Sequence, residues 1–217
     1  MKAVLFDAPE MIDQKIVRLA RVSSENPDNP NYKGLLKYLL KEGHYSPFDM
    51  INIVIELDCP RDIGRQILRH VGLKPQELSQ RYADVGDMLI EPRECRLQDV
   101  KNRQNSIVSD DVDLNEWWEQ AQKEVIDSVS YFYNTALEKG VAKECARVLL
   151  PEGLTNSKMY FNGSVRSWLF YCKARLHVST QKEHRDVAEQ IKLILEEVAP
   201  ETTKAFFELN QELGNGL

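Results

Sequence analysis

Apolar residues recur along the chain at two spacings, and the order of these spacings predicts the fold. In several stretches they lie three or four positions apart, which is the spacing of an amphipathic helix. Elsewhere they alternate with polar residues, as in a strand with one buried face. The predicted helices cover residues 10–22, 32–41, 60–70, 114–139, 142–150, 165–176, 180–198 and 202–213. The predicted strands cover residues 2–7, 51–57 and 93–97, of which residues 51–57 alternate most clearly.

Loops are predicted where proline, glycine and polar residues interrupt these patterns. Residues 23–32 contain two prolines, and residues 76–81 and 101–106 are mainly polar. Strands and helices do not alternate regularly, which argues against a doubly wound parallel sheet. The pattern therefore predicts an α/β (α+β) fold, with a small, mainly antiparallel sheet flanked by helices. No repeat or low-complexity linker divides the chain, so we expect a single domain over residues 1–217.

Composition narrows the class of protein without identifying its function. Of the 217 residues, 42% are hydrophobic and 29% are charged, which excludes a disordered or fibrous chain. The formal net charge of −6 argues against general nucleic-acid binding, because phosphate contacts require a basic face. The four cysteines are far apart in the sequence, which predicts free thiols. We find no signal peptide and no run approaching the ~20 apolar residues of a membrane span, so we expect a cytoplasmic protein without membrane contact.

Side chains that bind anions are concentrated between residues 61 and 81. Gln66 and Arg69 are three positions apart near the end of a predicted helix, so they are expected to share a face. Ser79 and Arg81 follow in a predicted loop, and an arginine, a hydroxyl and backbone amides together can form a phosphate site. The alternative is a helix carboxyl terminus that favours cations, followed by a solvated loop.

Three further arginines lie on apolar helices. Arg147 precedes a proline, and Arg166 and Arg175 are nine positions apart on one predicted helix. Burying such a cation is costly unless it meets an anion or a ligand. The alternative is that each arginine extends along the helix edge to reach solvent. The adjacent Glu183 and His184 project in different directions from a helix, so we predict no metal site.

Five ordered segments give these residues a family context. They are His44-Tyr45-Ser46-Pro47-Phe48, the stretch from Arg69-His70 to Gln76-Glu77-Leu78-Ser79-Gln80-Arg81-Tyr82, Lys101-Asn102-Arg103-Gln104-Asn105-Ser106, Glu144-Cys145-Ala146-Arg147 with Leu150-Pro151, and Arg166-Ser167-Trp168 through Arg175 to Thr180-Gln181-Lys182-Glu183-His184. In kind and order they resemble segments of the flavin-dependent thymidylate synthases, especially a branch that includes viral members. A viral member would act in the host cytoplasm.

The resemblance implies an activity and an assembly. Family members transfer a one-carbon unit from methylenetetrahydrofolate to C5 of dUMP, with FAD as redox cofactor and NADPH as reductant. No protein nucleophile attacks the base. The active sites form between the subunits of a homotetramer. The implied fold has a curved sheet flanked by helices.

The resemblance also implies roles for individual residues. Those at nucleotide-binding positions are Gln66, Arg69, Glu77, Ser79, Gln80, Arg81, Arg147 and Arg175. Those at flavin-binding positions are Ser46, Arg69, His70, Val71, Glu77, Ser164, Arg166 and Phe170. Arg175 is the expected catalytic residue, because a cation beside N3 of the pyrimidine stabilises its negative charge and makes C5 more nucleophilic.

Two departures from the family pattern leave the exact reaction open. Val71 stands where the family has the second arginine of Arg-His-Arg, and Phe170 stands where it has asparagine or histidine. Lys74 is a candidate to replace the lost charge. Three alternatives follow: a dUMP-methylating thymidylate synthase, an enzyme that methylates or hydroxymethylates C5 of a related nucleotide such as dCMP, and a non-catalytic nucleotide-binding homologue without flavin.

Overall fold

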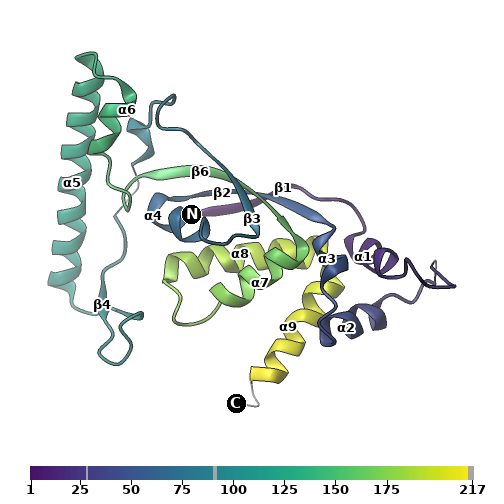
Figure 1. The fold of residues 1–217 in the computed structure, drawn as a ribbon. Coiled ribbons are helices and arrows are strands. Elements are labelled where there is room, and N and C mark those ends of the chain that lie inside the picture. Colours follow the sequence, from purple (N-terminus) through teal and green to yellow (C-terminus); the bar gives the residue numbers. More distant parts are fainter. Residues whose placement is uncertain (28, 90–91, 215–217) are drawn as a thin grey trace.

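A four-stranded antiparallel sheet forms the centre of the molecule (Figure 1). The computed structural model describes residues 1–27, 29–89 and 92–214. The strands lie in the order β1 (Lys2–Asp7), β2 (Asn52–Pro60), β6 (Asn156–Ser164) and β3 (Leu73–Glu77). Each neighbouring pair is antiparallel. The predicted fold class, a small antiparallel sheet with flanking helices, is confirmed.

The hydrophobic pattern misses β6, although β6 is a central strand of the sheet. It pairs with β2 from Asn52↔Ser164 to Pro60↔Asn156, and with β3 on its other side. Met159 and Phe161 are its fully buried apolar residues, and the strand also contains Asn156, Lys158, Asn162 and Gly163, which have low strand propensity. Gly163 is needed for packing, because a Cβ there would lie 2.5 Å from the Leu73 side chain. Contacts to both neighbouring strands therefore outweigh the weak local preference.

Helices cover the buried face of this sheet and one of its ends (Figure 1). They are α1 (Ile12–Ala20), α2 (Lys33–Lys41), α3 (Ser46–Asp49), α4 (Arg61–Ile67), α7 (Val165–Arg175), α8 (Lys182–Val198) and α9 (Pro200–Gly214). Alternate β2 residues, Ile53, Ile55 and Leu57, are fully buried and join Trp168 of α7 in the main core. The Trp168 indole also donates a hydrogen bond to the Ile53 carbonyl oxygen at 3.0 Å. This contact fixes α7 against the sheet. The short α3 has no counterpart in the predicted elements.

Two predictions around α4 and β3 are wrong. The helix ends at Ile67, so Arg69 lies in the following turn and shares no helix face with Gln66. Residues 73–77 form β3, whereas residues 76 and 77 were expected in a loop. Pro75 is tolerated because β3 pairs with β6 alone at the edge of the sheet.

A helical arm and a hairpin stand beside the sheet (Figure 1). The arm consists of α5 (Val112–Glu138), α6 (Lys143–Ala146) and the 3₁₀ turn η2 (Arg147–Leu149). It packs near the 3₁₀ turn η1 (Gly86–Met88) around a small second core of Val85, Tyr133 and Ala146. The continuous helix predicted over residues 142–150 is therefore wrong. The hairpin consists of β4 (Arg96–Gln98) and β5 (Ser106–Val108). A loop was predicted over residues 101–106, but the observed loop ends at residue 105, because Ser106 already belongs to β5.

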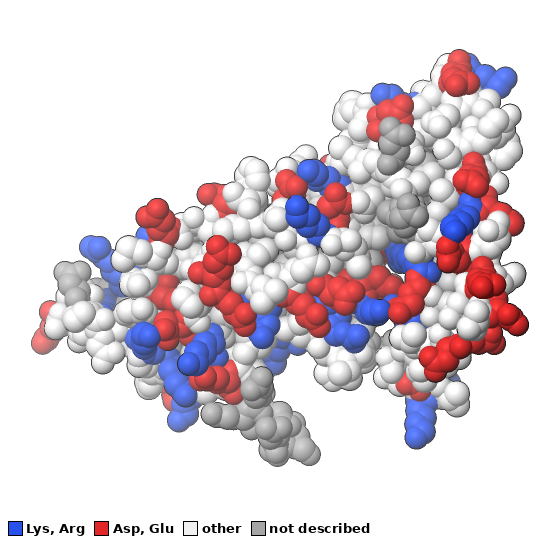
Figure 2. Space-filling view, turned by 180° about the vertical axis from the view of Figure 1, so that it is seen from behind, with Lys and Arg blue, Asp and Glu red and all other residues white. Residues whose placement is uncertain are grey.

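Most of the surface of α5 is exposed. Acidic side chains gather along this arm, whereas blue and red side chains intermingle over the rest of the face in Figure 2. The exposed acidic residues of α5 are Asp113, Glu116, Glu119, Glu124, Asp127 and Glu138. Its exposed aromatic residues include Trp117, Tyr131 and Phe132. Within the described residues, no helix combines the length and the apolar character needed to cross a bilayer.

Candidate functional site

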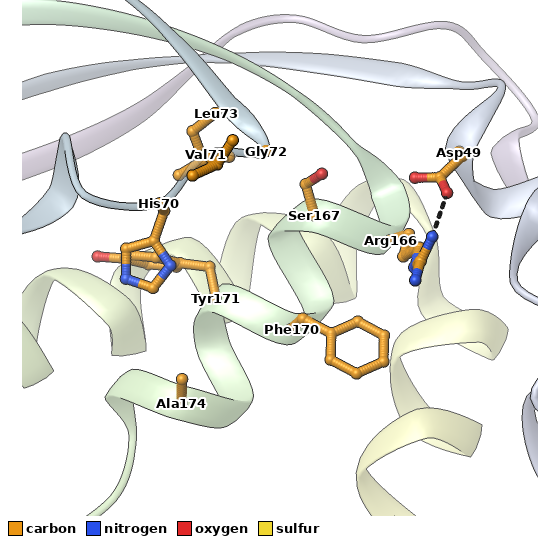
Figure 3. Close-up of a pocket in the computed structure, with 10 residues that line it drawn as sticks. All are labelled: Asp49, His70, Val71, Gly72, Leu73, Arg166, Ser167, Phe170, Tyr171 and Ala174. Atoms are coloured by element: carbon orange, nitrogen blue, oxygen red, sulfur yellow. Dashed lines mark hydrogen bonds and ion pairs between the residues drawn. The ribbon is translucent and has the colours of Figure 1, made fainter.

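A cavity of about 450 Å³ opens between α7 and the turn that leads into β3 (Figure 3). The residues of this turn form one wall, α7 forms the opposite wall, and Asp49 of α3 lies at one end. The lining residues are Asp49, His70, Val71, Gly72, Leu73, Arg166, Ser167, Phe170, Tyr171 and Ala174. Four of the residues at expected flavin positions, His70, Val71, Arg166 and Phe170, are among them.

Asp49 organises one end of the cavity. Its carboxylate accepts a hydrogen bond from the Arg166 guanidinium at 2.6 Å and another from the Ser164 hydroxyl at 2.8 Å. The Ser164 hydroxyl also accepts from the backbone amide of Ser167 at 3.1 Å and so caps the start of α7. The structure thus brings the expected residues Ser164 and Arg166 together through an aspartate that the sequence did not single out.

Aromatic rings surround the Arg166 guanidinium. Its central carbon lies 5.5 Å from the ring centre of Tyr45 and 5.8 Å from that of Phe170. Phe170 also meets Tyr45 and Phe206 edge to face, with ring centres 5.1 and 5.5 Å apart. These contacts hold Phe170 as part of an aromatic wall. Such a wall can also pack against a planar ring system.

The turn before β3 lies close to α7. At Gly72 an added Cβ would lie 2.6 Å from the Ser167 hydroxyl oxygen, so only glycine permits this approach. Val71 is 85% exposed and adds apolar surface to the cavity rim. The Lys74 ammonium group lies 3.4 Å from the Val71 carbonyl oxygen. A cation is therefore present at the turn, although it comes from a different position than the family pattern has.

His70 and Arg175 contact each other beside the cavity. The Arg175 Nε donates a hydrogen bond to the Nε2 atom of His70 at 2.8 Å. Partial burial, together with the positive charge of Arg175, lowers the pKa of His70 to about 4. His70 is therefore neutral near pH 7 and accepts at Nε2, so its proton must be on Nδ1. Among the described residues, no partner is found for the two terminal nitrogens of Arg175.

Two buried side chains, Tyr171 and His184, lie next to this pair. Tyr171 lies edge to face with His70 at 4.9 Å, and in Figure 3 its ring passes behind the imidazole. Burial raises the pKa of Tyr171 well above its usual value. His184 is fully buried, and burial together with the charges of Arg175 and His70 lowers its pKa to about 3. Among the described residues, neither the Tyr171 hydroxyl nor the His184 Nε2 has a hydrogen-bond partner.

His70, which is partly buried, and His184, which is fully buried, predict an acid sensitivity. Their folded pKa values, about 4 for His70 and about 3 for His184, lie below the usual value of 6.5. The unfolded chain therefore binds more protons, so their contribution to stability is complete above pH 6.5 and is lost as the pH falls toward 4. We expect the His70→Asn variant to lose less unfolding free energy than wild type over this range in denaturant titrations. The exposed His177→Gln variant is the matched control, and an equal slope for His70→Asn and wild type would contradict the assignment.

Glu77 is the centre of a separate ionic cluster. Its carboxylate accepts hydrogen bonds from Arg61 at 2.8 Å, from Arg65 at 3.1 Å and from the Ser157 hydroxyl at 3.1 Å. The two arginines also contact Glu152, at 3.3 and 3.5 Å. Glu77 was expected at a nucleotide and flavin position, but within the chain its carboxylate binds these neighbours. The side chain of Arg61 is 10% exposed and depends on this cluster for its countercharge.

The other expected nucleotide-binding residues lie near α6. Arg81 pairs with Glu144 at 3.1 Å, and its backbone amide donates to the Ser79 hydroxyl. Arg147 donates from Nε to the Glu144 carbonyl oxygen at 3.2 Å. Gln80 is buried, and its amide nitrogen has no partner among the described residues. In Figure 1, α6 lies in the arm beside α5, whereas α7 lies beneath the sheet.

Two of the expected site residues, Ser46 and Arg69, lie outside these groups. The sequence also failed to identify three residues that shape the site: Asp49, Arg61 and Tyr171. Ser46 is exposed at the start of α3, and Arg69 is exposed in the turn after α4. Asp49 has a sequence signal only in its nearness to the Ser46-Pro47-Phe48 segment, and Arg61 only in its place within the anion-binding region. Tyr171 has no signal, because it reads as one apolar position of a helix. Across residues 1–27, 29–89 and 92–214, no cluster of three His, Cys, Asp or Glu side chains suits a metal ion.

Comparison with known proteins places this geometry in context. A family profile described as "Thymidylate synthase complementing protein" matches residues 4–201. A flavin-dependent thymidylate synthase from Synechocystis sp. is 46% identical over 173 residues, covering 80% of this chain and 79% of that protein. A probable flavin-dependent thymidylate synthase from Paramecium bursaria Chlorella virus 1 is 40% identical over 195 residues, covering 89% of each.

A solved structure has the same arrangement of elements. The UMP/dUMP methylase PolB from Streptomyces cacaoi, bound with 5-Br dUMP, superposes with a TM-score of 0.84 at 26% identity. The superposition covers 95% of this chain and 94% of that one. The resemblance that the five sequence segments indicate is therefore confirmed, including the similarity to a viral protein.

Proposed function

Because the chain belongs to the thymidylate synthase complementing protein family, we propose that it transfers a one-carbon unit from methylenetetrahydrofolate to C5 of dUMP, with FAD as cofactor and NADPH as reductant. The chain is an enzyme of the flavin-dependent thymidylate synthase kind, as the family match and the curated relatives show. The choice of dUMP, of the folate donor and of the reductant is the proposed part.

The observation that carries the proposal is the contact of Arg175 with His70 at the cavity. The neutral His70 accepts from Nε of Arg175 and so orients the guanidinium, while the two terminal nitrogens remain available. A guanidinium placed beside N3 and the neighbouring carbonyl oxygen of uracil stabilises negative charge on the ring. That charge increases the electron density at C5, where the new carbon–carbon bond forms. His70 then acts as an orienting acceptor rather than as an acid near neutral pH.

The residues of the cavity fit a flavin. Val71, Leu73 and Phe170 supply apolar walls, and Ser167 and Arg166 supply polar contacts. A bound flavin supplies hydride-transfer chemistry. Arg166 remains a hydrogen-bond donor to it even though Asp49 balances its charge. The expected roles of Ser164, Arg166 and Phe170 as flavin contacts are part of this proposal.

The division of the nucleotide residues supports an assembly with shared sites. Gln66 belongs to α4 and Arg175 ends α7, whereas Arg81 pairs with Glu144 of α6 and Arg147 begins η2. In Figure 1, α6 lies in the arm and α7 lies beneath the sheet, and we infer that a site using both sets takes them from two copies of the chain. The exposed aromatic residues of α5 supply the apolar surface that an obligate interface buries. We propose a homotetramer, and light scattering of the purified protein measures it directly.

A substrate panel tests the proposed reaction. Purified protein is incubated with FAD, NADPH, methylenetetrahydrofolate and either dUMP or dCMP, and the nucleotide product is identified by mass. We expect thymidylate from dUMP and no product from dCMP. A cytosine product alone would instead assign the related reaction, in which Arg175 donates to the unprotonated N3 of cytosine. A protein without flavin absorbance that cannot be reconstituted with FAD would contradict both redox functions.

A further inference from the structure

A chain of polar side chains runs from the β4–β5 hairpin to the proposed nucleotide side of the cavity. Arg96 of β4 donates a hydrogen bond from Nη2 to Oε2 of Glu183 at 2.8 Å, and the same nitrogen lies 2.7 Å from Oε1 of that carboxylate. The Gln181 amide nitrogen donates to Glu183 at 3.0 Å, and the Gln66 amide nitrogen donates to the Gln181 oxygen at 2.8 Å. The chain ends at His184, whose Nδ1 lies 3.2 Å from the Gln66 oxygen.

The carboxylate of Glu183 fixes the direction of every link. Burial alone would raise the pKa of Glu183, but the hydrogen bonds from Arg96 and Gln181 outweigh burial and lower the pKa. An ionised carboxylate only accepts hydrogen bonds, so Gln181 must turn its NH₂ group toward Glu183. Its carbonyl oxygen then faces Gln66, which must in turn present its own NH₂ group. A reversed Gln181 would place two acceptors against each other.

The last link determines the tautomer of His184. The Gln66 oxygen faces Nδ1, so Nδ1 must carry the proton. The Nε2 atom is then an acceptor, and it has no partner among the described residues. His184 in turn lies against Tyr171, with ring centres 5.7 Å apart, and Tyr171 contacts His70. The series of hydrogen bonds that starts at Glu183 therefore ends beside the side chains that contact the pair of His70 and Arg175.

We propose that Glu183 is a positioning residue, which acts through Gln181 to hold the Gln66 amide in one orientation for the nucleotide. The effect on nucleotide binding rests on the proposed function, whereas the direction of the hydrogen bonds does not. An amide that is already held in its bound orientation loses less conformational entropy when the nucleotide binds. Glu183 is 8% exposed and does not line the cavity beside α7, from which it is separated by Gln181, Gln66, His184 and Tyr171.

The test compares three variants of the full-length protein. Glu183→Gln can donate as well as accept, so it releases the direction of Gln181. Gln181→Met removes the middle link but leaves the ion pair of Glu183 with Arg96, and it serves if Glu183→Gln does not fold. Glu94→Gln is the matched control. Glu94 pairs with Arg96 and Lys182 in the same cluster, but among the described residues it has no hydrogen bond to Gln181 or Gln66. Thermal unfolding verifies that each variant is folded.

Two readouts separate the proposal from a merely structural role. NMR of the protein with isotope-labelled histidine shows which ring nitrogen of His184 carries the proton. We expect the Nδ1 tautomer in wild type and Glu94→Gln, and its loss in Glu183→Gln and Gln181→Met. Calorimetry should show dUMP binding weakened about three- to tenfold in the same two variants, as expected for one misdirected hydrogen bond.

The outcomes are distinguishable. An unchanged His184 tautomer in a folded Glu183→Gln variant would overturn the directional chain. A changed tautomer with unchanged dUMP affinity would overturn the positioning role. Wild-type protein that does not bind dUMP would contradict the proposed function. The tautomer measurement would still test the direction of the hydrogen bonds from Glu183 to His184.

Discussion

Replacing Arg175 by alanine is expected to lower kcat for thymidylate formation by about a hundred- to a thousandfold, the usual effect of removing one donor that stabilises transition-state charge. The substitution removes the hydrogen bond that Arg175, the last residue of α7, donates to His70. Because Arg175 is partly exposed at the end of the helix, the fold should survive. Steady-state kinetics with dUMP, together with thermal unfolding, measures both effects.

Lys173→Ala is the matched control for this substitution. Lys173 is also a cation of α7, two residues away, but it is exposed, and among the described residues no hydrogen bond joins it to His70. We expect its kcat to remain within about twofold of wild type, as for other surface substitutions. If Arg175→Ala retained nearly full activity, the catalytic role of Arg175 would be wrong.

Replacing Glu77 by alanine is expected to destabilise the fold by about 3 kcal/mol. Glu77 accepts hydrogen bonds from Arg61, Arg65 and Ser157, and its removal leaves the nearly buried Arg61 with only Glu152 as countercharge. An uncompensated cation in this position is costly because little solvent reaches it. The free energy of unfolding from denaturant titration gives the result.

Glu152→Ala distinguishes burial from ion pairing as such. Glu152 contacts the same two arginines, but its side chain is 54% exposed. We expect this variant to lose less than about 1 kcal/mol, as exposed ion pairs do. Equal losses of unfolding free energy in the two variants would show that the less exposed position of Glu77, at the end of β3 against α4, adds nothing to the stability of its ion pairs.

The sequence predicts the fold where local pattern and tertiary packing agree. The regular alternation of β2 and the amphipathic spacing of α8 place these elements within a few residues of their bounds. The strand β6 fails this test, because its register and burial depend on β2 and β3 rather than on its own composition. Likewise, the local pattern cannot show that α4 ends at Ile67, since the turn that follows is fixed by the contact of Gly72 with α7.

The residues of the candidate site also differ in how far the sequence predicts them. Resemblance to the family selects His70, Arg166 and Phe170, and the structure places all three around one cavity. It cannot supply Asp49 or Tyr171, whose importance comes from contacts between segments distant in the sequence. It also cannot show that α6 and α7 belong to different parts of the structure, because the arrangement of the elements is a property of the fold.

The most direct test of the proposed reaction follows the transferred carbon. The purified protein is incubated with FAD, NADPH, dUMP and methylenetetrahydrofolate that carries an isotopic label in its methylene carbon. We predict thymidylate with the label in its C5 methyl group, and no labelled nucleotide when FAD is omitted from flavin-free protein. A C5-modified product without the label, or no conversion of dUMP by flavin-loaded protein, would contradict the account.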